Sequence, residues 1–323
     1  MRYYVAFDGG GSKIAAILYD ENLHMISHAM GSSMNTSSTS REQVTKNSED
    51  VCAKLLEGTG VTEVECCYGV FPRILSSALA NTVKLNRLDD RGGEGLVGFL
   101  AAGIRGDNAI MTLSGTGSVI FYNHDGRGDE AGGYGSVVHD EGSGYHMGRM
   151  AFAAAIKDFE QRGPKTLISE EICKKLGAED IGEAAYKIYN VEGKSPIAAV
   201  ASVAPCVGKA ARRGDPIAAE LLRECGINLA EQTLGLIRRC KAPIDVPVVL
   251  AGGHFKNDRR ISDALIAHIE ENDPGRKVII PYFEPIVGSV MVRLLAEEDR
   301  MPTPEEREFM KREYEDFRFR IHE

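Results

Sequence analysis

The sequence predicts an α/β protein with two related domains. A length of 323 residues suits two domains of ordinary size, each able to bury its own core. A strand, a glycine-rich turn and a second strand begin near residue 3, and the same order begins again near residue 109. An alanine-rich helical stretch follows the second pair of strands. The alternative to a duplicated domain is a chance recurrence, because glycine turns are common at hairpins.

Composition narrows the class of protein. Hydrophobic residues make up 43% of the chain and charged residues 26%, which is typical of a globular protein. The formal net charge is −9, the wrong sign for a general nucleic-acid binder. No apolar run approaches the ~20 residues that cross a bilayer, and Asp8 comes too early for the apolar core of a signal peptide. We therefore expect a cytoplasmic enzyme with no nucleic-acid or membrane partner.

The seven cysteines form no CxxC pair and no Cys/His finger spacing, and their number is odd. This pattern argues against a disulfide framework and against structural zinc, and it favours reduced thiols in the cytosol. Cys206, Cys225 and Cys240 fall on helical patterns and are expected to be small core residues.

The first predicted elements form a β-hairpin. Residues 3–7 are aromatic and β-branched, residues 8–12 interrupt them with three glycines, and residues 14–19 resume an extended pattern. A turn at residues 20–22 and an apolar stretch up to Ile26 extend the hairpin to a meander.

A polar loop, a helix and the second hairpin are predicted next. Residues 31–40 are rich in serine and threonine, and a helical pattern runs over about 41–57. The second hairpin has strands at 109–113 and 119–122, joined by the turn 114–118, which contains two glycines.

The remainder of the chain is helical before strands return. We expect a helical insertion over about 151–240, strands at 246–251 and 277–280, and a surface helix at 304–323 that packs on the first domain. The expected domains are residues 1–108, alone or joined by 304–323, and residues 109–303, which contain the insertion.

Both glycine-rich turns, at residues 8–13 and 114–118, are candidate phosphate-binding loops. Glycines allow close approach, and consecutive backbone N–H groups can point into one concavity. Neither turn matches the P-loop or Rossmann pattern, and ordinary hairpin turns remain the alternative. A carboxylate beside bound phosphate would repel it unless a cation lay between them, so Asp8 indicates Mg²⁺. An Asx turn is the alternative role for Asp8.

Four segments together resemble a known superfamily. Residues 8–13, 113–118 and 248–253 resemble the phosphate-1, phosphate-2 and adenosine motifs of the sugar kinase, Hsp70 and actin superfamily. Residues 132–145 read GGYGSVVHDEGSGY and look like the corresponding stretch of the N-acetylglucosamine kinases, within the BadF/BadG/BcrA/BcrD ATPase family. The resemblance spans nearly the whole chain, and this last segment is the specific one.

That resemblance implies two ribonuclease H-like, actin-like ATPase domains, with a helical insertion in the second and ATP bound between them. It implies transfer of a phosphoryl group from ATP to a hydroxyl of an amino sugar, with Mg²⁺ at Asp8, and it implies a homodimer. The residues that it assigns to ATP are Gly10, Gly11, Ser12, Lys13, Thr116, Gly117, Ser118, Gly252 and Gly253. The residues that it assigns to the sugar are Asn35, Asp90, Gly133, Tyr134 and Asp140.

Similar kinases also use a carboxylate to accept the proton of the sugar hydroxyl. They place it in an Asn-Asp-Ala setting, whereas residues 85–93 here read LNRLDDRGG. Asp90 is our assignment and Asp89 the alternative, and a solvated Asp-Asp turn remains open. Arg91 could pair with either carboxylate and hold it ionised.

Two residues of the implied sugar pocket depart from the family pattern. His139 stands where relatives commonly have Gly, and Tyr134 stands where many have Trp. We expect His139 to pack or to form hydrogen bonds rather than to act as a base, because no hydroxyl nucleophile or metal partner is indicated nearby. The identity of the acceptor sugar is therefore left open.

Two other functions fit parts of the sequence. The same wider family includes ATPase activators of 2-hydroxyacyl-CoA dehydratases and benzoyl-CoA reductase, which hold an iron–sulfur cluster between two subunits. This chain has no cysteine pair at the expected place after the second phosphate turn. The irregular setting of Asp89 and Asp90 also fits a sugar or nucleotide sensor that binds without catalysis.

Overall fold

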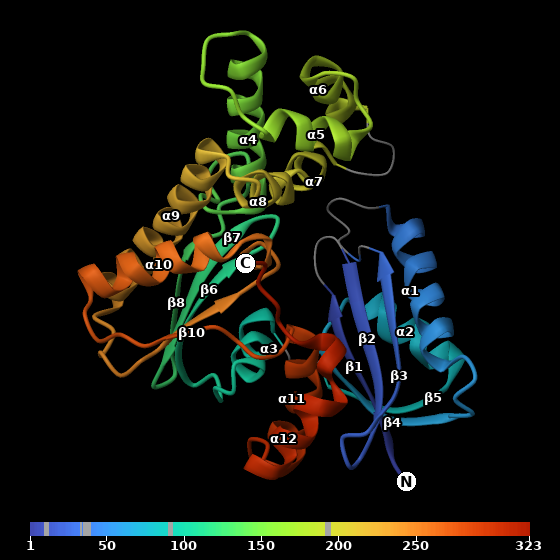
Figure 1. Ribbon diagram of the computed structural model, residues 1–323. Helices are drawn as coiled ribbons and strands as arrows, with labels where there is room; N and C mark the ends of the chain where they lie inside the picture. The colour runs from blue at the N-terminus through green and yellow to red at the C-terminus, as the bar shows by residue number, and fades with distance from the viewer. Residues whose placement is uncertain (10–12, 33, 35–39, 90–92, 191–194) are drawn as a thin grey trace. The chain divides into compact units, whose positions relative to one another are not determined.

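A computed structural model of the chain describes residues 1–9, 13–32, 34, 40–89, 93–190 and 195–323. The chain forms two compact units (Figure 1). The first unit contains residues 1–106 and 281–319, and the second contains residues 107–280 and 320–323. Each unit has a mixed five-stranded sheet with helices, which confirms the predicted α/β fold class.

The sheet of the first unit has the strand order β3-β2-β1-β4-β5. Its strands are β1 (Tyr3–Gly9), β2 (Lys13–Asp20), β3 (Met25–Ser32), β4 (Glu63–Val70) and β5 (Lys84–Leu88). The first three strands pair antiparallel, whereas β4 pairs parallel with β1 and β5 pairs parallel with β4. The predicted meander is therefore confirmed, although its third strand runs beyond Ile26 to Ser32. Strands β4 and β5 were not predicted.

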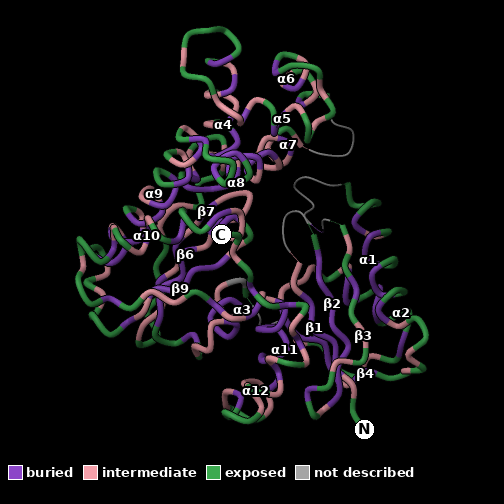
Figure 2. Tube along the Cα trace, viewed as in Figure 1, coloured by how far each residue is buried: buried purple, intermediate pink, exposed green. Residues whose placement is uncertain are grey.

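Helices cover both faces of this sheet. They are α1 (Arg41–Leu56), α2 (Arg73–Thr82), α3 (Glu94–Ala101), α11 (Pro285–Glu298) and α12 (Pro304–Glu313). Because side chains alternate along a strand, Val5 and Phe7 belong to a core with α1 and α2, whereas Tyr4 and Ala6 belong to a core with α11 and α12. Figure 2 shows β1 and β2 buried along most of their length.

The first unit extends further along the chain than expected. Residues 281–303 were expected in the second domain, but α11 lies in the first unit, where Val287 and Val290 are fully buried in the core that contains Tyr4. The C-terminal helix ends at Glu313 and is followed by the short 3-10 helix η2 (Glu315–Phe317), so it is shorter than the predicted 304–323.

The second sheet repeats the plan of the first, with the order β10-β9-β6-β7-β8. Its strands are β6 (Asn108–Ser114), β7 (Ser118–His124), β8 (Arg127–Gly132), β9 (Val248–Ala251) and β10 (Val278–Ile279). Again three consecutive strands pair antiparallel, whereas β9 pairs parallel with β6 and β10 pairs parallel with β9. The second hairpin and both later strands are confirmed, with β10 shorter than predicted, and β8 was not predicted.

A helical insertion separates β8 from β9, as predicted, but it begins at Gly144 rather than near residue 151. Its helices are α4 (Gly144–Phe159), α5 (Ile168–Leu176), α6 (Ile181–Tyr189), α7 (Pro196–Ala201), α8 (Ala204–Arg212) and α9 (Pro216–Cys240). Helix α9 packs on β6, β7 and β8, and α10 (Arg259–Asn272) lies beside α9 (Figure 1). Among the described residues, no helix combines the length and the apolar character that crossing a membrane requires.

Local sequence explains the long helix α9. Its first residue is Pro216, which tolerates the first helical position because its missing N–H would have no partner there. Asp215 precedes it and accepts the backbone N–H groups of Ile217 and Ala218 at 2.8 and 3.1 Å. The helix therefore begins at a fixed place, which holds its buried face against the sheet.

Candidate active site

The turn between β6 and β7 presents free backbone donors. Ser114 pairs with Ser118 across the hairpin, and the Gly115 N–H donates to the Gly117 carbonyl at 2.8 Å. Within the described residues, the N–H groups of Thr116 and Gly117 make no hydrogen bond. A Cβ on Gly115 would meet no atom within 4 Å, so the space around it is open. Successive unpartnered N–H groups in an open glycine turn suit an anion.

Helix α4 fixes the other side of this turn. The N–H of Gly144 donates to the Gly115 carbonyl at 2.8 Å, and the N–H of Tyr145 donates to the Thr116 carbonyl at 3.1 Å. The first helical donors are thus used on the turn, and the Ser143 side chain caps the helix by accepting the His146 N–H at 3.1 Å. Because these carbonyls are occupied, the turn offers a ligand its N–H groups and the positive end of a 16-residue helix nearby.

The carboxylate of Asp140 lies against the same turn. It accepts hydrogen bonds from the Gly135 N–H and the Ser136 hydroxyl, both at 3.2 Å, and only 4% of the residue is exposed. A Cβ on Gly117 would lie 2.5 Å from the Asp140 Oδ2, so only glycine fits there without displacing the carboxylate. The structure therefore brings together a predicted sugar residue and a predicted phosphate turn, which the sequence separates by more than 20 positions.

The predicted adenosine segment also meets this turn. Gly252 follows β9 with a φ of +100°, and a Cβ there would lie 2.1 Å from the Ser114 carbonyl oxygen. The His254 N–H donates to that same oxygen at 3.0 Å. At Gly253 the nearest atom to an added Cβ is a side-chain atom 4.0 Å away. The backbone of this segment therefore lies directly against the end of β6, and only glycine at residue 252 leaves room for this contact.

The remaining predicted sugar residues of the second unit lie beside β7. The N–H of Gly133 donates to the Ser118 carbonyl at 3.0 Å. Tyr134 is 69% exposed, and its ring meets the His139 ring edge-on at 5.9 Å. The His139 Nε2 lies 3.9 Å from the Glu141 carboxylate. The ring contact with Tyr134 agrees with the packing expected of His139, whereas its buried Nδ1 makes no hydrogen bond to the described residues.

Three predicted site residues lie at one edge of the first sheet. Asp8 is paired with Val70 near the ends of β1 and β4, and Asp89 directly follows β5, with its N–H donating to the Cys67 carbonyl at 3.2 Å. Lys13 is the exposed first residue of β2. Since β1, β4 and β5 are parallel, their carboxyl ends share this edge. Gly10, Gly11, Ser12, Asn35 and Asp90 lie outside the described residues.

Carboxylates rather than a preformed metal cage characterise the candidate site. Among the described residues, no group of three or more His, Cys, Asp or Glu side chains is placed to hold a metal ion. Mg²⁺ does not need such a cage, because it commonly binds through one or two carboxylates together with phosphates and water. The half-buried carboxylate of Asp8 is a donor of that kind.

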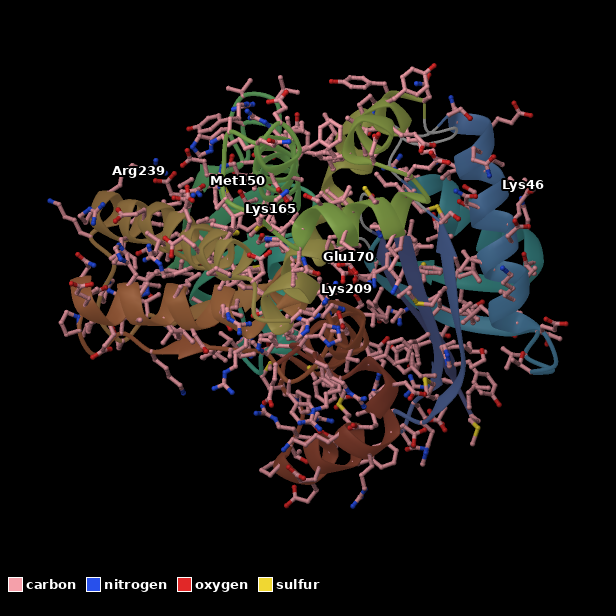
Figure 3. The ribbon with its side chains drawn as sticks, turned by 45° about the horizontal axis from the view of Figure 1, so that its top comes forward. Lys46, Met150, Lys165, Glu170, Lys209 and Arg239 are labelled. Carbon is pink, nitrogen blue, oxygen red and sulfur yellow. The ribbon has the colours of Figure 1, made fainter. Side chains whose placement is uncertain are left out.

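Two cavities lie elsewhere in the second unit. One of about 690 Å³ is lined by Tyr122, His124 and Lys241, among others, at the end of β7 that lies away from the glycine turn. The other, of about 330 Å³, lies between α4 and α9, where Met150 lines it (labelled in Figure 3). Neither contains a residue that the sequence predicts to bind a ligand.

Sequence reasoning missed the groups that support the site. The Gly135 N–H and the Ser136 hydroxyl hold the Asp140 carboxylate, and their positions five and four residues before it were the available signal. His254 is 3% exposed and directly follows the predicted adenosine glycines, yet no motif singled it out. Burial, together with the nearby His146, lowers the pKa of His254 to about 4.

Comparison with known proteins gives a consistent assignment. The family model described as the BadF/BadG/BcrA/BcrD ATPase family matches residues 6–292. An N-acetylmuramic acid/N-acetylglucosamine kinase from Clostridium acetobutylicum is 26% identical over 313 residues, covering 90% of this chain and 98% of the relative. An N-acetyl-D-glucosamine kinase from Dictyostelium discoideum is 27% identical over 195 residues, covering 57% of this chain and 59% of the relative.

A solved structure shares the fold. It is that of a candidate N-acetylglucosamine kinase from Chromobacterium violaceum, and it matches with a TM-score of 0.67 at 22% identity. The match covers 90% of this chain and 99% of that chain. At this identity the similarity is evidence of a common fold.

Proposed function

Because the chain belongs to the BadF/BadG/BcrA/BcrD ATPase family, whose membership implies the use of ATP, we propose that it is an ATP-dependent amino-sugar kinase. Its substrate class is N-acetylglucosamine or glucosamine and their close relatives. The names of the two curated relatives support this class, since both are kinases of N-acetylated amino sugars.

One observation carries the proposal. The Asp140 carboxylate, which is matched by resemblance to a sugar-contacting position, packs directly on Gly117 of the phosphate turn. A kinase must hold an acceptor hydroxyl next to the phosphoryl group that it transfers, because proximity supplies much of the rate enhancement. Hydrogen bonds from the Gly135 N–H and the Ser136 hydroxyl fix the orientation of this carboxylate.

The chain offers donors and carboxylates for each part of the nucleotide. In this proposal Thr116, Gly117 and Ser118 bind phosphate oxygens through the turn, and Gly252 and Gly253 flank the adenosine. Gly10, Gly11, Ser12 and Lys13 bind the β- and γ-phosphates. When bound at Asp8, Mg²⁺ neutralises charge on the phosphate oxygens.

Proton transfer is assigned to the Asp89–Asp90 pair. The sugar hydroxyl attacks the γ-phosphorus, the bond from that phosphorus to the bridging oxygen of ADP breaks, and the hydroxyl proton passes to Asp90. Asp89 is the alternative acceptor. Asn35, Gly133, Tyr134 and Asp140 hold the sugar, so that its hydroxyl faces the carboxylate.

The direct test is sugar-stimulated release of ADP. Purified protein with Mg²⁺-ATP is given N-acetylglucosamine, N-acetylmuramic acid, glucosamine, glucose and anhydro-sugars in turn. We expect an amino sugar to give the fastest turnover. If no sugar stimulates ADP release, the kinase proposal is wrong.

Replacing the base separates catalysis from binding. We expect Asp90→Asn to lower kcat by ~10²-fold or more, because a general base contributes on that scale, while ADP affinity stays within about twofold. Asp89→Asn is the matched control. The reverse result would assign the proton to Asp89, and loss of activity in neither variant would exclude this pair as the base.

We also propose that the protein is a cytoplasmic homodimer. All seven cysteines are free, which suits a reducing compartment. Light scattering of the purified protein tests the dimer, and a monomeric mass at working concentration would contradict it.

A further inference from the structure

A buried chain of hydrogen bonds joins the two nucleotide segments of the second unit. His254 lies at the end of the adenosine segment, and its Nε2 is 3.3 Å from the Cys225 Sγ on α9. The Cys225 Sγ is also 3.2 Å from the Gly142 carbonyl oxygen. That oxygen accepts the Ser114 hydroxyl at 2.8 Å, and Ser114 begins the phosphate turn. His254 and Cys225 are 3% and 0% exposed, so water does not compete for these bonds.

The donors and acceptors in this series of hydrogen bonds have one consistent assignment. The Asn257 amide lies 2.9 Å from the His254 Nδ1 and donates to it, which leaves the proton of the neutral ring on Nε2. The Nε2–H then donates to the Cys225 sulfur, and the Cys225 thiol donates to the Gly142 carbonyl. His254 and Cys225 each receive one bond and give one, whereas the Gly142 carbonyl accepts from both Cys225 and Ser114. Removal of the Cys225 side chain therefore leaves the buried Nε2–H of His254 without its partner.

Further contacts hold the segment around His254 in place. The Asn257 carbonyl accepts the Arg212 guanidinium at 2.8 Å, and a Cβ on Gly208 would lie 2.6 Å from that carbonyl oxygen. On the opposite side, the Gly142 N–H donates to the His146 Nδ1 at 3.1 Å. Both ends of the chain of bonds are thus anchored in helices of the insertion.

We propose that His254 and Cys225 are positioning residues that set the spacing between the adenosine-binding glycines and the phosphate-binding turn. The inference rests on the proposed function, because it takes Gly252 and Gly253 as the adenosine segment and Thr116 and Gly117 as the phosphate segment. Neither positioning residue touches the nucleotide. The two residues therefore affect the affinity only of a ligand that contacts both segments at once. Once such a ligand has bound one segment, the strength of its contact with the other depends on the distance between the two segments.

Three ligands test the spacing directly. ADP spans both segments, whereas adenosine and pyrophosphate each occupy one. We expect Cys225→Ala to weaken ADP by about 10-fold, because it orphans the buried Nε2–H of His254. Adenosine and pyrophosphate should keep their affinities within about twofold, as measured by calorimetry or by competition with a labelled nucleotide.

The chain offers a matched control at Cys206. This thiol is 1% exposed and donates to the Glu171 carbonyl at 3.4 Å, so it resembles Cys225 in burial and in bonding but lies away from both segments. We expect Cys206→Ala to leave all three affinities unchanged. Cys225→Ser should restore ADP binding to within about threefold of the wild-type affinity, because a hydroxyl both donates and accepts.

The outcomes separate this inference from the proposed function. Wild-type affinity for ADP in Cys225→Ala, or an equal loss for all three ligands, would overturn the inference. If the wild-type protein binds ADP but phosphorylates no sugar, the kinase proposal fails, and the three affinities of Cys225→Ala still test the positioning role. If the wild-type protein does not bind ADP, both fail. Should Cys225→Ala not fold, Asn257→Ala tests the chain from the other side of His254, with the same expected loss of ADP affinity.

Discussion

The two units solve the same backbone problem with different partners. In each, a glycine of positive φ lies near the end of the strand that pairs parallel with the unit's first strand. Gly69, at +112°, is the penultimate residue of β4, and Gly252, at +100°, directly follows β9. A Cβ would lie 2.0 Å from the Phe7 carbonyl in the first case and 2.1 Å from the Ser114 carbonyl in the second. The repeat therefore extends from strand order to a single close backbone contact.

The units differ in what donates to that carbonyl. In the first unit, the Ser289 hydroxyl of α11 donates to the Phe7 carbonyl at 2.9 Å. In the second, the donor is the backbone N–H of His254, whose buried ring continues into the neutral network with Cys225. Only the second arrangement contains a titratable ring. The same strand arrangement can therefore have its carbonyl paired by a side-chain hydroxyl or by a backbone N–H that precedes a buried imidazole. Only in the second case do we expect the stability of the contact to change in mild acid.

The largest expected effect comes from filling these contacts. Gly252→Ala and Gly69→Ala should each destabilise the protein by about 4 kcal/mol or fail to fold, because the Cβ forces the strands apart in a conformation that alanine already disfavours. Gly58→Ala is the control, since Gly58 has a φ of +70° and nothing lies within 4 Å of an added Cβ. It should cost about 1 kcal/mol. Urea unfolding followed by circular dichroism measures all three, and equal losses at the three sites would refute the shared role.

The next effect is a pH dependence that distinguishes the units. Burial lowers the pKa of His254 to about 4, against about 6.5 in the unfolded chain. Above pH 6.5 both states are neutral and the stabilisation is complete. As the pH falls from 6.5 toward 4, the unfolded chain takes up a proton that the folded ring refuses, so stability falls by up to about 3 kcal/mol. Burial lowers the pKa of His146 as well, which adds a loss of the same sign.

The measurement is urea unfolding at pH 7, 6 and 5. His254→Gln should reduce the slope of unfolding free energy against pH, because the titrating group is gone. Glu297→Gln should leave that slope unchanged between pH 7 and 5, since the carboxyl titrates below this range. A wild-type slope in His254→Gln would show that the ring does not govern acid sensitivity.

The sequence predicted the elements with strong local signals and missed those defined by tertiary contacts. The hairpins and their glycine turns were readable because alternating apolar residues flank a break in the pattern, as at Ser114 to Ser118. Strand β5 could not be predicted from the sequence, because it reads KLNRL and its residues are mostly exposed. It forms a strand through its pairing with β4. The placement of α11 with the first sheet was also hidden, since its apolar residues could cover either sheet.

The site shows the same division. Gly117 and Asp140 could be named from motifs, and their contact is now visible. His254, Cys225 and Asn257 carry no motif, because their role depends on which polar groups remain unpaired after burial. Such residues are identified by hydrogen bonds between distant segments, here separated by 29 positions between Cys225 and His254.

The smallest expected effect concerns an ion pair in the first unit, which tests how that unit responds to acid. Glu297 on α11 accepts the Tyr68 hydroxyl at 2.9 Å and pairs with the Arg87 guanidinium. Burial disfavours its charge, but hydrogen bonds from Tyr68 and Arg87 outweigh burial and lower its pKa below 4.5. Its contribution is therefore present above pH 4.5 and is lost as the pH falls below that value.

We expect Glu297→Gln to destabilise the protein by about 2 kcal/mol at pH 7, because it leaves Arg87 without its main partner and weakens the bond to Tyr68. The matched control is Glu63→Gln, whose exposed pair with Lys84 should contribute nothing measurable. The difference between the two variants should shrink at pH 4, because the carboxyl of the unfolded wild-type chain takes up a proton more readily than the folded one below pH 4.5. A constant difference from pH 7 to pH 4 would mean that the glutamate acts through packing alone. Glu297 would then add nothing to the acid sensitivity of the first unit, and the contrast with His254 in the second unit would become larger.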